Sequence, residues 1–100
     1  MHSLKITHLS GFGEKLTGLI GVKSVYPVFF TTRWGIHTFG MKVPIDMVIL
    51  DNTFRIVKLT HKLPPNRIFL WNPRYDNVLE LPPGEIKKRN MNVDDSVNLL

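Results

Sequence analysis

Apolar and polar residues alternate along much of this chain, in short segments separated by turn-forming residues. The opening segment 4–9 follows this pattern, which is typical of a strand with one buried face. Segment 54–60 alternates in the same way after the turn residues Asp51-Asn52, and it predicts a hairpin with the apolar segment 46–50. Further strand-like segments lie at 28–32, 36–41, 68–71, 77–81 and 96–100. We expect six to seven short strands from this pattern.

Two segments follow the helical period instead. Segment 14–20 places its apolar residues on one stripe, and segment 85–90 has a helical composition. No repeat, low-complexity tract or linker interrupts the chain, so residues 1–100 are expected to form a single domain. The predicted fold class is mostly β (a β-rich α+β domain). We expect a curled antiparallel sheet or small open barrel, with the two short helices closing its ends.

One carboxylate stands out because Asp46 lies among the apolar residues of segment 45–50. An unpaired carboxylate in a buried strand is costly, so Asp46 should have a partner or hold a loop in place. The candidate partners are backbone N–H groups around the Pro44 corner, an arginine among Arg33, Arg67 and Arg74, and a polar ligand bound beside His37.

A ligand site can be composed around this carboxylate. His37, Thr38 and Asp46 would supply polar contacts, Trp71 an apolar floor, and Arg74 a contact for an anionic or carbonyl group. Structural alternatives remain open, because a half-buried histidine can fix a strand crossing and an aromatic residue can plug a loop. We assign no catalytic residue. The enzymatic alternative uses His37 and Asp46 as an acid–base pair on a small polar substrate.

Charge adds a further alternative. The chain carries 13 Lys and Arg against 8 Asp and Glu, a net charge of +5, and such a basic balance is compatible with a nucleic-acid partner. The basic residues are scattered, however, and only Lys87-Lys88-Arg89 forms a run. This run is the candidate nucleic-acid-binding surface, whereas its simplest interpretation is a solvated helix face near the helix C-terminus.

Several function classes are excluded by what the sequence lacks. Without cysteine there is no disulfide, thiol nucleophile or zinc finger, and the four histidines have no metal-ligand spacing. No phosphate-binding or nucleophile motif occurs, so we expect neither a metal nor a cofactor. The expected partner is a small polar molecule or a protein, bound by a monomer or weak dimer. No apolar segment is long enough to span a membrane, and a cytoplasmic location is expected.

The ordered motifs of the chain resemble those of one family. They are HTFGMKVPID at 37–46, LTGLIG at 16–21, VLELPPG at 78–84 and VDDSV at 93–97. In this order they are similar to domain of unknown function family 192 (uncharacterised protein family 0127), a family of small bacterial and archaeal proteins. The resemblance covers nearly the whole chain and implies a small β-rich single domain. It brings no established reaction, so we expect a non-catalytic or accessory ligand- or partner-binding module.

Overall fold

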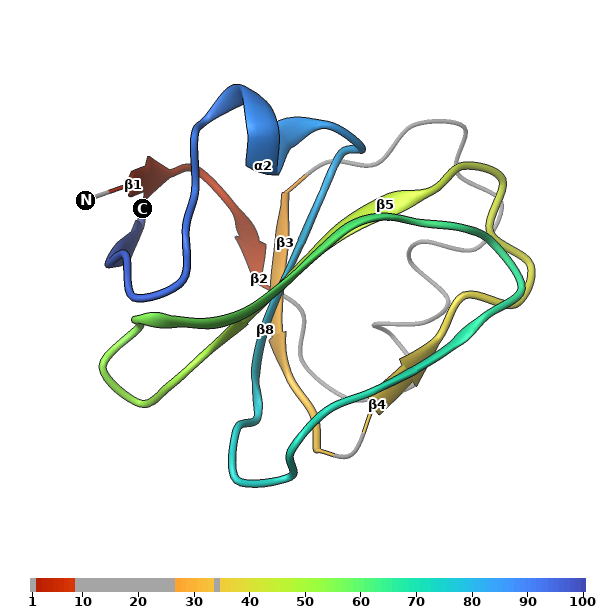
Figure 1. Cartoon of the computed structure of the whole chain (residues 1–100), viewed down its shortest axis with the longest axis horizontal. Coiled ribbons are helices and arrows are strands. Elements are labelled where there is room, and N and C mark those ends of the chain that lie inside the picture. The colour runs from red at the N-terminus through yellow and green to blue at the C-terminus, as the bar shows by residue number, and fades with distance from the viewer. Residues whose placement is uncertain (1, 9–26, 34) are drawn as a thin grey trace.

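The fold is mostly β, as the sequence predicts, and the computed structural model describes residues 2–8, 27–33 and 35–100 (Figure 1). Its strands are β1 (His2–Leu4), β2 (Thr7–His8), β3 (Val28–Thr31), β4 (Gly35–His37), β5 (Ile45–Leu50), β6 (Ile56–Leu63), β7 (Ile68–Leu70), β8 (Asn77–Leu81) and β9 (Val97–Leu99). The predicted helix at 85–90 is confirmed as α2 (Glu85–Lys88). The predicted helix at 14–20 lies outside the described residues.

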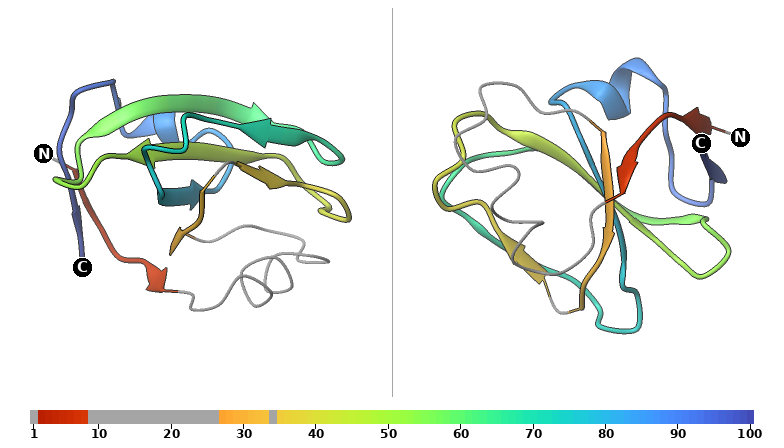
Figure 2. Two further views of the ribbon diagram at one scale, coloured as in Figure 1. Left: turned by 90° about the horizontal axis from the view of Figure 1, so that it is seen from below. Right: turned by 180° about the vertical axis from the view of Figure 1, so that it is seen from behind.

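The central feature is a five-stranded sheet in the order β2-β3-β8-β5-β6. Its pairs are antiparallel except for β2 with β3. Two ribbons accompany it, β4 with β7 antiparallel and β1 with β9 parallel. Among the described residues the strands form open sheets and close no barrel. The parallel pairing of β1 with β9 brings the two ends of the chain together (Figures 1 and 2), and α2 and β4 lie on opposite sides of β5 in the view of Figure 1.

Strand β5 explains how the core is built, because all six of its residues are buried. Its side chains alternate between two apolar clusters, one on each face of the sheet. The ribbon-side core contains Val28, Phe30, Ile36, Ile45, Met47, Ile49, Leu63, Trp71 and Val78. The helix-side core contains Leu4, Val48, Leu50, Ile56, Leu79, Leu81, Ile86, Met91 and Val97. A strand covered on both faces reads as a continuous apolar run, which is what the sequence shows here.

The predicted hairpin between β5 and β6 is confirmed, and Asp51 organises its turn. Its Oδ1 atom accepts hydrogen bonds from the backbone N–H groups of Thr53 (2.8 Å) and Arg55 (2.9 Å) and from the Thr53 hydroxyl (2.7 Å). These bonds, the one from Arg55 first, hold the pKa of the Asp51 carboxyl below its usual value. Between them Phe54 adopts a left-handed backbone conformation (φ 60°) that reverses the chain.

Several strand boundaries differ from the prediction, and β6, for example, begins at Ile56 and extends to Leu63. Segment 36–41 leaves the strand after His37, because the next residue, Thr38, uses its backbone and hydroxyl groups to hold the turn that precedes β7. Segment 4–9 is interrupted at Lys5-Ile6, and its two parts join different sheets. In the described part of the chain, no helix has the length and apolar character needed to cross a membrane.

Candidate functional site

Asp46 has the partners that its burial demands. Its side chain is completely buried; Oδ1 accepts a hydrogen bond from the Lys62 N–H (2.8 Å), and Oδ2 accepts one from the Ile86 N–H (2.9 Å). Both donors are backbone groups, as one of the sequence-based alternatives expected. They come from β6 and α2, however, and not from the Pro44 corner. The carboxylate therefore ties the end of β6 to the first turn of α2.

The local backbone explains why Asp46 serves both elements. The pairing of β5 with β6 is irregular between Ile45 and Met47, and Lys62 opposite adopts a left-handed conformation (φ 48°). Near the other hydrogen-bond donor, Ile86, Gly84 precedes α2 in a left-handed conformation (φ 91°) and has no side chain with which to cap the helix. Because the first N–H groups of a helix need acceptors, Asp46 supplies from β5 the cap that Gly84 lacks.

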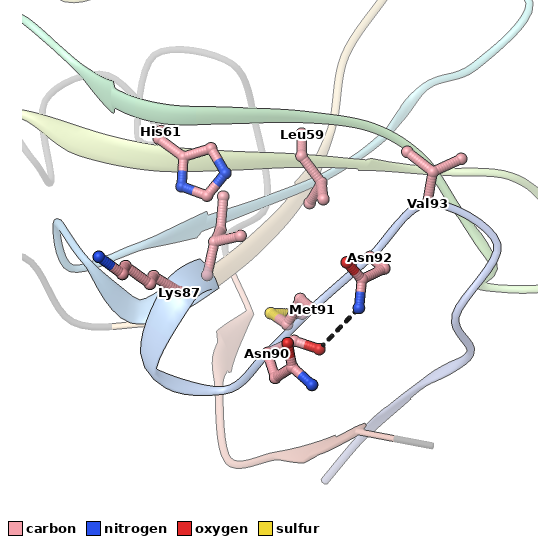
Figure 3. Close-up of a pocket in the computed structure, with 8 residues that line it drawn as sticks. Leu59, His61, Lys87, Asn90, Met91, Asn92 and Val93 are labelled. Carbon is pink, nitrogen blue, oxygen red and sulfur yellow. Dashed lines mark hydrogen bonds between the residues drawn. The ribbon is translucent and has the colours of Figure 1, made fainter.

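The two elements joined by Asp46 form the walls of a pocket of about 380 Å³ (Figure 3). Leu59, His61, Ile86, Lys87, Asn90, Met91, Asn92 and Val93 line it. The side chains of His61 and Lys87 lie near one end of the pocket, and those of Asn90 and Asn92 lie toward the other (Figure 3). Ile86 and Met91 are buried and make an apolar floor, whereas His61 and Lys87 are exposed.

The pocket has a defined chemical character. Its described lining offers an ammonium group, an imidazole and two amides, but no carboxylate and no hydroxyl. The amide of Asn92 donates a hydrogen bond to the Asn90 carbonyl oxygen (3.1 Å), and the Asn92 N–H donates to Asp95 Oδ2 (2.9 Å). These bonds hold the segment that follows α2. The lining therefore suits a ligand with an anionic or carbonyl group and an apolar part.

His37 and Thr38 lie elsewhere, in and just after β4. Thr38 is almost fully buried; its hydroxyl donates to the Pro64 carbonyl oxygen (2.8 Å) and accepts from the Arg67 N–H (2.9 Å). The ring of His37 stacks on Phe39 with centroids 4.8 Å apart, and its Nδ1 accepts a hydrogen bond from the Phe39 N–H (3.3 Å). The hydroxyl of Thr38 thus joins the end of β4 to the turn before β7.

His37 and Asp46 are not brought together. Asp46 reaches α2 on the face of the sheet that carries the helix-side core. The neighbour of His37 in β4, Ile36, packs into the ribbon-side core on the other face, which places His37 on the outer side of the ribbon. The sheet therefore lies between the two side chains, and they do not form the acid–base pair of the enzymatic alternative.

Trp71 and Arg74 follow β7, and the structure separates them by exposure. Trp71 is buried in the ribbon-side core, where its Nε1–H donates to the Tyr75 carbonyl oxygen (2.7 Å). Its ring packs against Phe69, with centroids 5.7 Å apart. Arg74 is exposed, and its backbone N–H donates to Asn72 Oδ1 (3.0 Å). Trp71 is thus the aromatic plug of its loop, and neither residue lines the pocket beside α2.

The basic run is divided in the same way. Lys87 lines the pocket, Lys88 is exposed, and Arg89 Nε lies 2.7 Å from Glu85 Oε2, in an ion pair one helical turn apart. The run is therefore no uniform basic face, because one of its three charges is paired. The sequence does not single out His61, because a polar residue on an alternating strand gives no signal of the helix that faces it.

Glu80 in β8 is a second buried carboxyl group, and it is not among the site residues predicted from the sequence. It is 3% exposed and lies in register with Val28 and Met47, both residues of the ribbon-side core. Its Oε2 has no hydrogen-bond partner among the described residues. Burial raises the pKa of the Glu80 carboxyl to about 8. The sequence does contain an indication of this buried group, because Glu80 is a charged residue between Leu79 and Leu81, just as Asp46 is a charged residue among apolar ones.

The described residues contain no group of three or more His, Cys, Asp or Glu side chains placed to hold a metal ion. The candidate site is therefore defined by the pocket between β6 and α2, with Asp46 behind it. It belongs to a small β-rich α+β domain with one short described helix beside its sheet.

Comparison with known proteins places this domain in a family. Residues 2–99 match the model of domain of unknown function family 192 (DUF192), described as "Uncharacterized ACR". The chain belongs to this family, as its motifs predict. No curated protein matches the sequence.

Two solved structures share the fold. A protein of Sinorhizobium meliloti 1021, described as a "putative transcription regulator", superimposes with a TM-score of 0.77 at 17% identity over 91% of this chain and 78% of that one. A protein of unknown function from Novosphingobium aromaticivorans DSM 12444 gives a TM-score of 0.76 at 14% identity over 94% of this chain and 71% of that one. At these identities the likeness concerns the fold alone.

Proposed function

We propose that this domain is a non-catalytic binding module, and that the pocket between β6 and α2 takes a small organic anion. The observation that carries the proposal is the polar part of the pocket lining, in which Lys87, His61, Asn90 and Asn92 accompany the apolar residues Ile86 and Met91. A volume of about 380 Å³ lies within the range of small-molecule sites. This proposal agrees with the sequence-based hypothesis that the domain binds a polar ligand, but it places the ligand pocket on the α2 side of the sheet.

The sign of the ligand charge follows from the groups at the pocket. Lys87 has no ion-pair partner among the described residues, whereas its neighbour Arg89 is paired with Glu85. An ammonium group beside a concave apolar surface attracts a carboxylate or phosphate, and the amides of Asn90 and Asn92 can add hydrogen bonds. The absence of a carboxylate or hydroxyl from the described lining favours binding over hydrolysis.

The test compares anionic probes with neutral ones of similar shape, namely phenyl phosphate with benzyl alcohol and benzoate with benzamide. Binding is measured by calorimetry on the wild type and two variants. Lys87→Gln removes the charge at the pocket, and Lys88→Gln removes a charge from the next residue, which does not line it. We expect anions to bind more tightly than neutral probes, and Lys87→Gln to weaken anion binding about tenfold. Equal affinities in the two variants, or no preference for anions, would contradict the proposal.

Nucleic-acid binding is the second candidate. It is favoured by the net charge of +5 and by the description of the Sinorhizobium neighbour as a "putative transcription regulator". Its surface would include Lys87 and Lys88, with Arg89 engaged by Glu85. Affinity for a DNA duplex should then fall steeply with salt and drop to a similar degree in Lys87→Gln and Lys88→Gln. A flat salt response would remove this candidate.

A further inference from the structure

The outer face of the β4–β7 ribbon belongs neither to the two apolar cores nor to the pocket beside α2. In the register of this ribbon Gly35 lies opposite Leu70, and His37 lies opposite Ile68. Residues directly opposite in an antiparallel pair point to the same side. Phe39 joins them through its stacking on His37. We call Gly35, His37, Phe39, Ile68 and Leu70 the ribbon face.

The ribbon face is apolar and open to solvent. Ile68 is 66% exposed, Leu70 64% and Phe39 47%. Three of the five large apolar side chains that are exposed among the described residues therefore belong to the ribbon face. Isolated exposed apolar residues are normal in folded proteins, but their grouping on a short ribbon marks an interaction surface.

The ribbon is held firmly from behind. Ile36 and Phe69, which alternate with the residues of the ribbon face, pack on the ribbon-side core. The Thr38 N–H donates to the Arg67 carbonyl oxygen (2.8 Å), and the Thr38 hydroxyl binds Pro64 and Arg67. A Cβ atom at Gly35 would lie 2.3 Å from the Phe69 carbonyl oxygen, so the strands approach closely there. A rigid apolar surface loses little entropy when it binds a partner.

The described charges that flank the ribbon in sequence have one sign. Arg33 precedes β4, Arg67 precedes β7, Lys42 follows the turn after Phe39, and all three are exposed. The described residues 27–33 and 35–45 contain no Asp or Glu, and neither does the segment 52–75. Among the described residues the apolar surface thus has a positive border, although the whole chain contains eight acidic residues.

We propose that the ribbon face binds an acidic segment of a partner protein whose apolar side chains cover Ile68, Leu70 and Phe39. The positive border supplies the charge complementarity that selects an acidic partner. A second copy of this chain is disfavoured, because its own ribbon face would bring the same positive charges into contact. Nucleic acid is disfavoured because two of the three large exposed side chains are aliphatic, whereas bases stack on aromatic rings.

The experiment measures fluorescence anisotropy of a labelled short peptide of alternating leucine and glutamate. A peptide of alternating serine and glutamate tests charge alone, one of leucine and lysine tests apolarity alone, and an oligothymidine tests nucleic acid. The protein variant is Ile68→Ser with Leu70→Ser. Its matched control is Leu100→Ser, which removes another exposed leucine (62% exposed) away from the ribbon.

We expect the leucine–glutamate peptide to bind most tightly of the four probes. Its affinity should fall about tenfold or more in the double variant and stay unchanged in Leu100→Ser. No binding of this peptide by the wild type, or equal binding by the double variant, overturns the proposal. So does tighter binding of oligothymidine or of the serine–glutamate peptide. Sedimentation of the protein alone gives the last outcome: a dimer dissociated by the double variant would assign the face to a second copy.

Discussion

Two buried carboxyl groups on opposite faces of one sheet differ in the hydrogen-bond partners that their surroundings offer. Asp46 and Glu80 both interrupt apolar strands, and they lie on the neighbouring strands β5 and β8. Asp46 accepts two backbone hydrogen bonds, whereas Glu80 Oε2 has no partner among the described residues. The first carboxyl group therefore stabilises the fold through the hydrogen bonds that it accepts. The second favours its protonated form, because burial penalises the charge.

Replacing Asp46 should destabilise the domain. Asp46→Ala leaves the part-buried N–H group of Lys62 and the buried N–H group of Ile86 without their acceptors, and we expect the free energy of unfolding to fall by about 2–4 kcal/mol. Asp46→Asn should lose less, because its amide oxygen can still accept one of the two bonds. Urea denaturation of both variants measures the effect. An unchanged unfolding free energy in Asp46→Ala would refute the role assigned to this carboxylate.

Glu80 predicts a pH dependence of stability. Its pKa is raised from an ordinary value of 4.5 to about 8, so the folded state keeps a proton that the unfolded state releases. The free energy of unfolding should therefore fall as the pH rises through this range. Glu80→Gln should remove that decline, and at pH 8 it should exceed the wild type by on the order of 2–4 kcal/mol. Denaturation at several pH values checks this, and parallel profiles for the two proteins would contradict it.

At the scale of elements, single side chains join segments whose backbones have few regular bonds between them. Asp46 fixes α2, a helix of four residues whose preceding Gly84 offers no side-chain cap. Thr38 fixes the turn before β7 in the same manner. Such short elements have little stability of their own, so they depend on these bonds and on the residues they bury.

Thr38 gives a direct test at this scale. Thr38→Val keeps the volume but removes the hydroxyl, and it leaves the Pro64 carbonyl oxygen and the Arg67 N–H with poorer partners. We expect a loss of about 1–3 kcal/mol in unfolding free energy and faster hydrogen exchange at the Arg67 amide. Thr38→Ser, which retains the hydroxyl, should recover most of the loss. Equal stability of the valine and serine variants would argue against the bond.

At the scale of the whole molecule, the pocket beside α2 and the ribbon face belong to different faces of the central sheet, because α2 packs on the helix-side core and the β4–β7 ribbon packs on the ribbon-side core. The sheet between the two proposed binding surfaces is packed on both faces. A ligand in the pocket leaves the ribbon face free. The two proposals can accordingly be tested independently on the same protein.

The same scale shows what sequence can predict. The hairpin at Asp51 and the strand-like segments that form β5, β6 and β8 are local patterns, and the structure confirms them. The partners of Asp46 lie 16 and 40 residues away, and sequence spacing gives no measure of such proximity. For the same reason the pairing of β1 with β9 and the meeting of His61 with α2 could not be predicted. The residues around Asp46 indicate that it needs a partner, but they do not indicate which groups are that partner.

An NMR titration of the protein with phenyl phosphate, following every assigned backbone amide, tests the location of the binding site most directly. We expect the largest shifts at the pocket, at Leu59, His61 and residues 86–93, and we expect Lys87→Gln to reduce them while Lys88→Gln does not. Shifts centred on His37, Thr38 and Arg74, or spread equally over all basic residues, would contradict the assignment of the binding site to the pocket between β6 and α2.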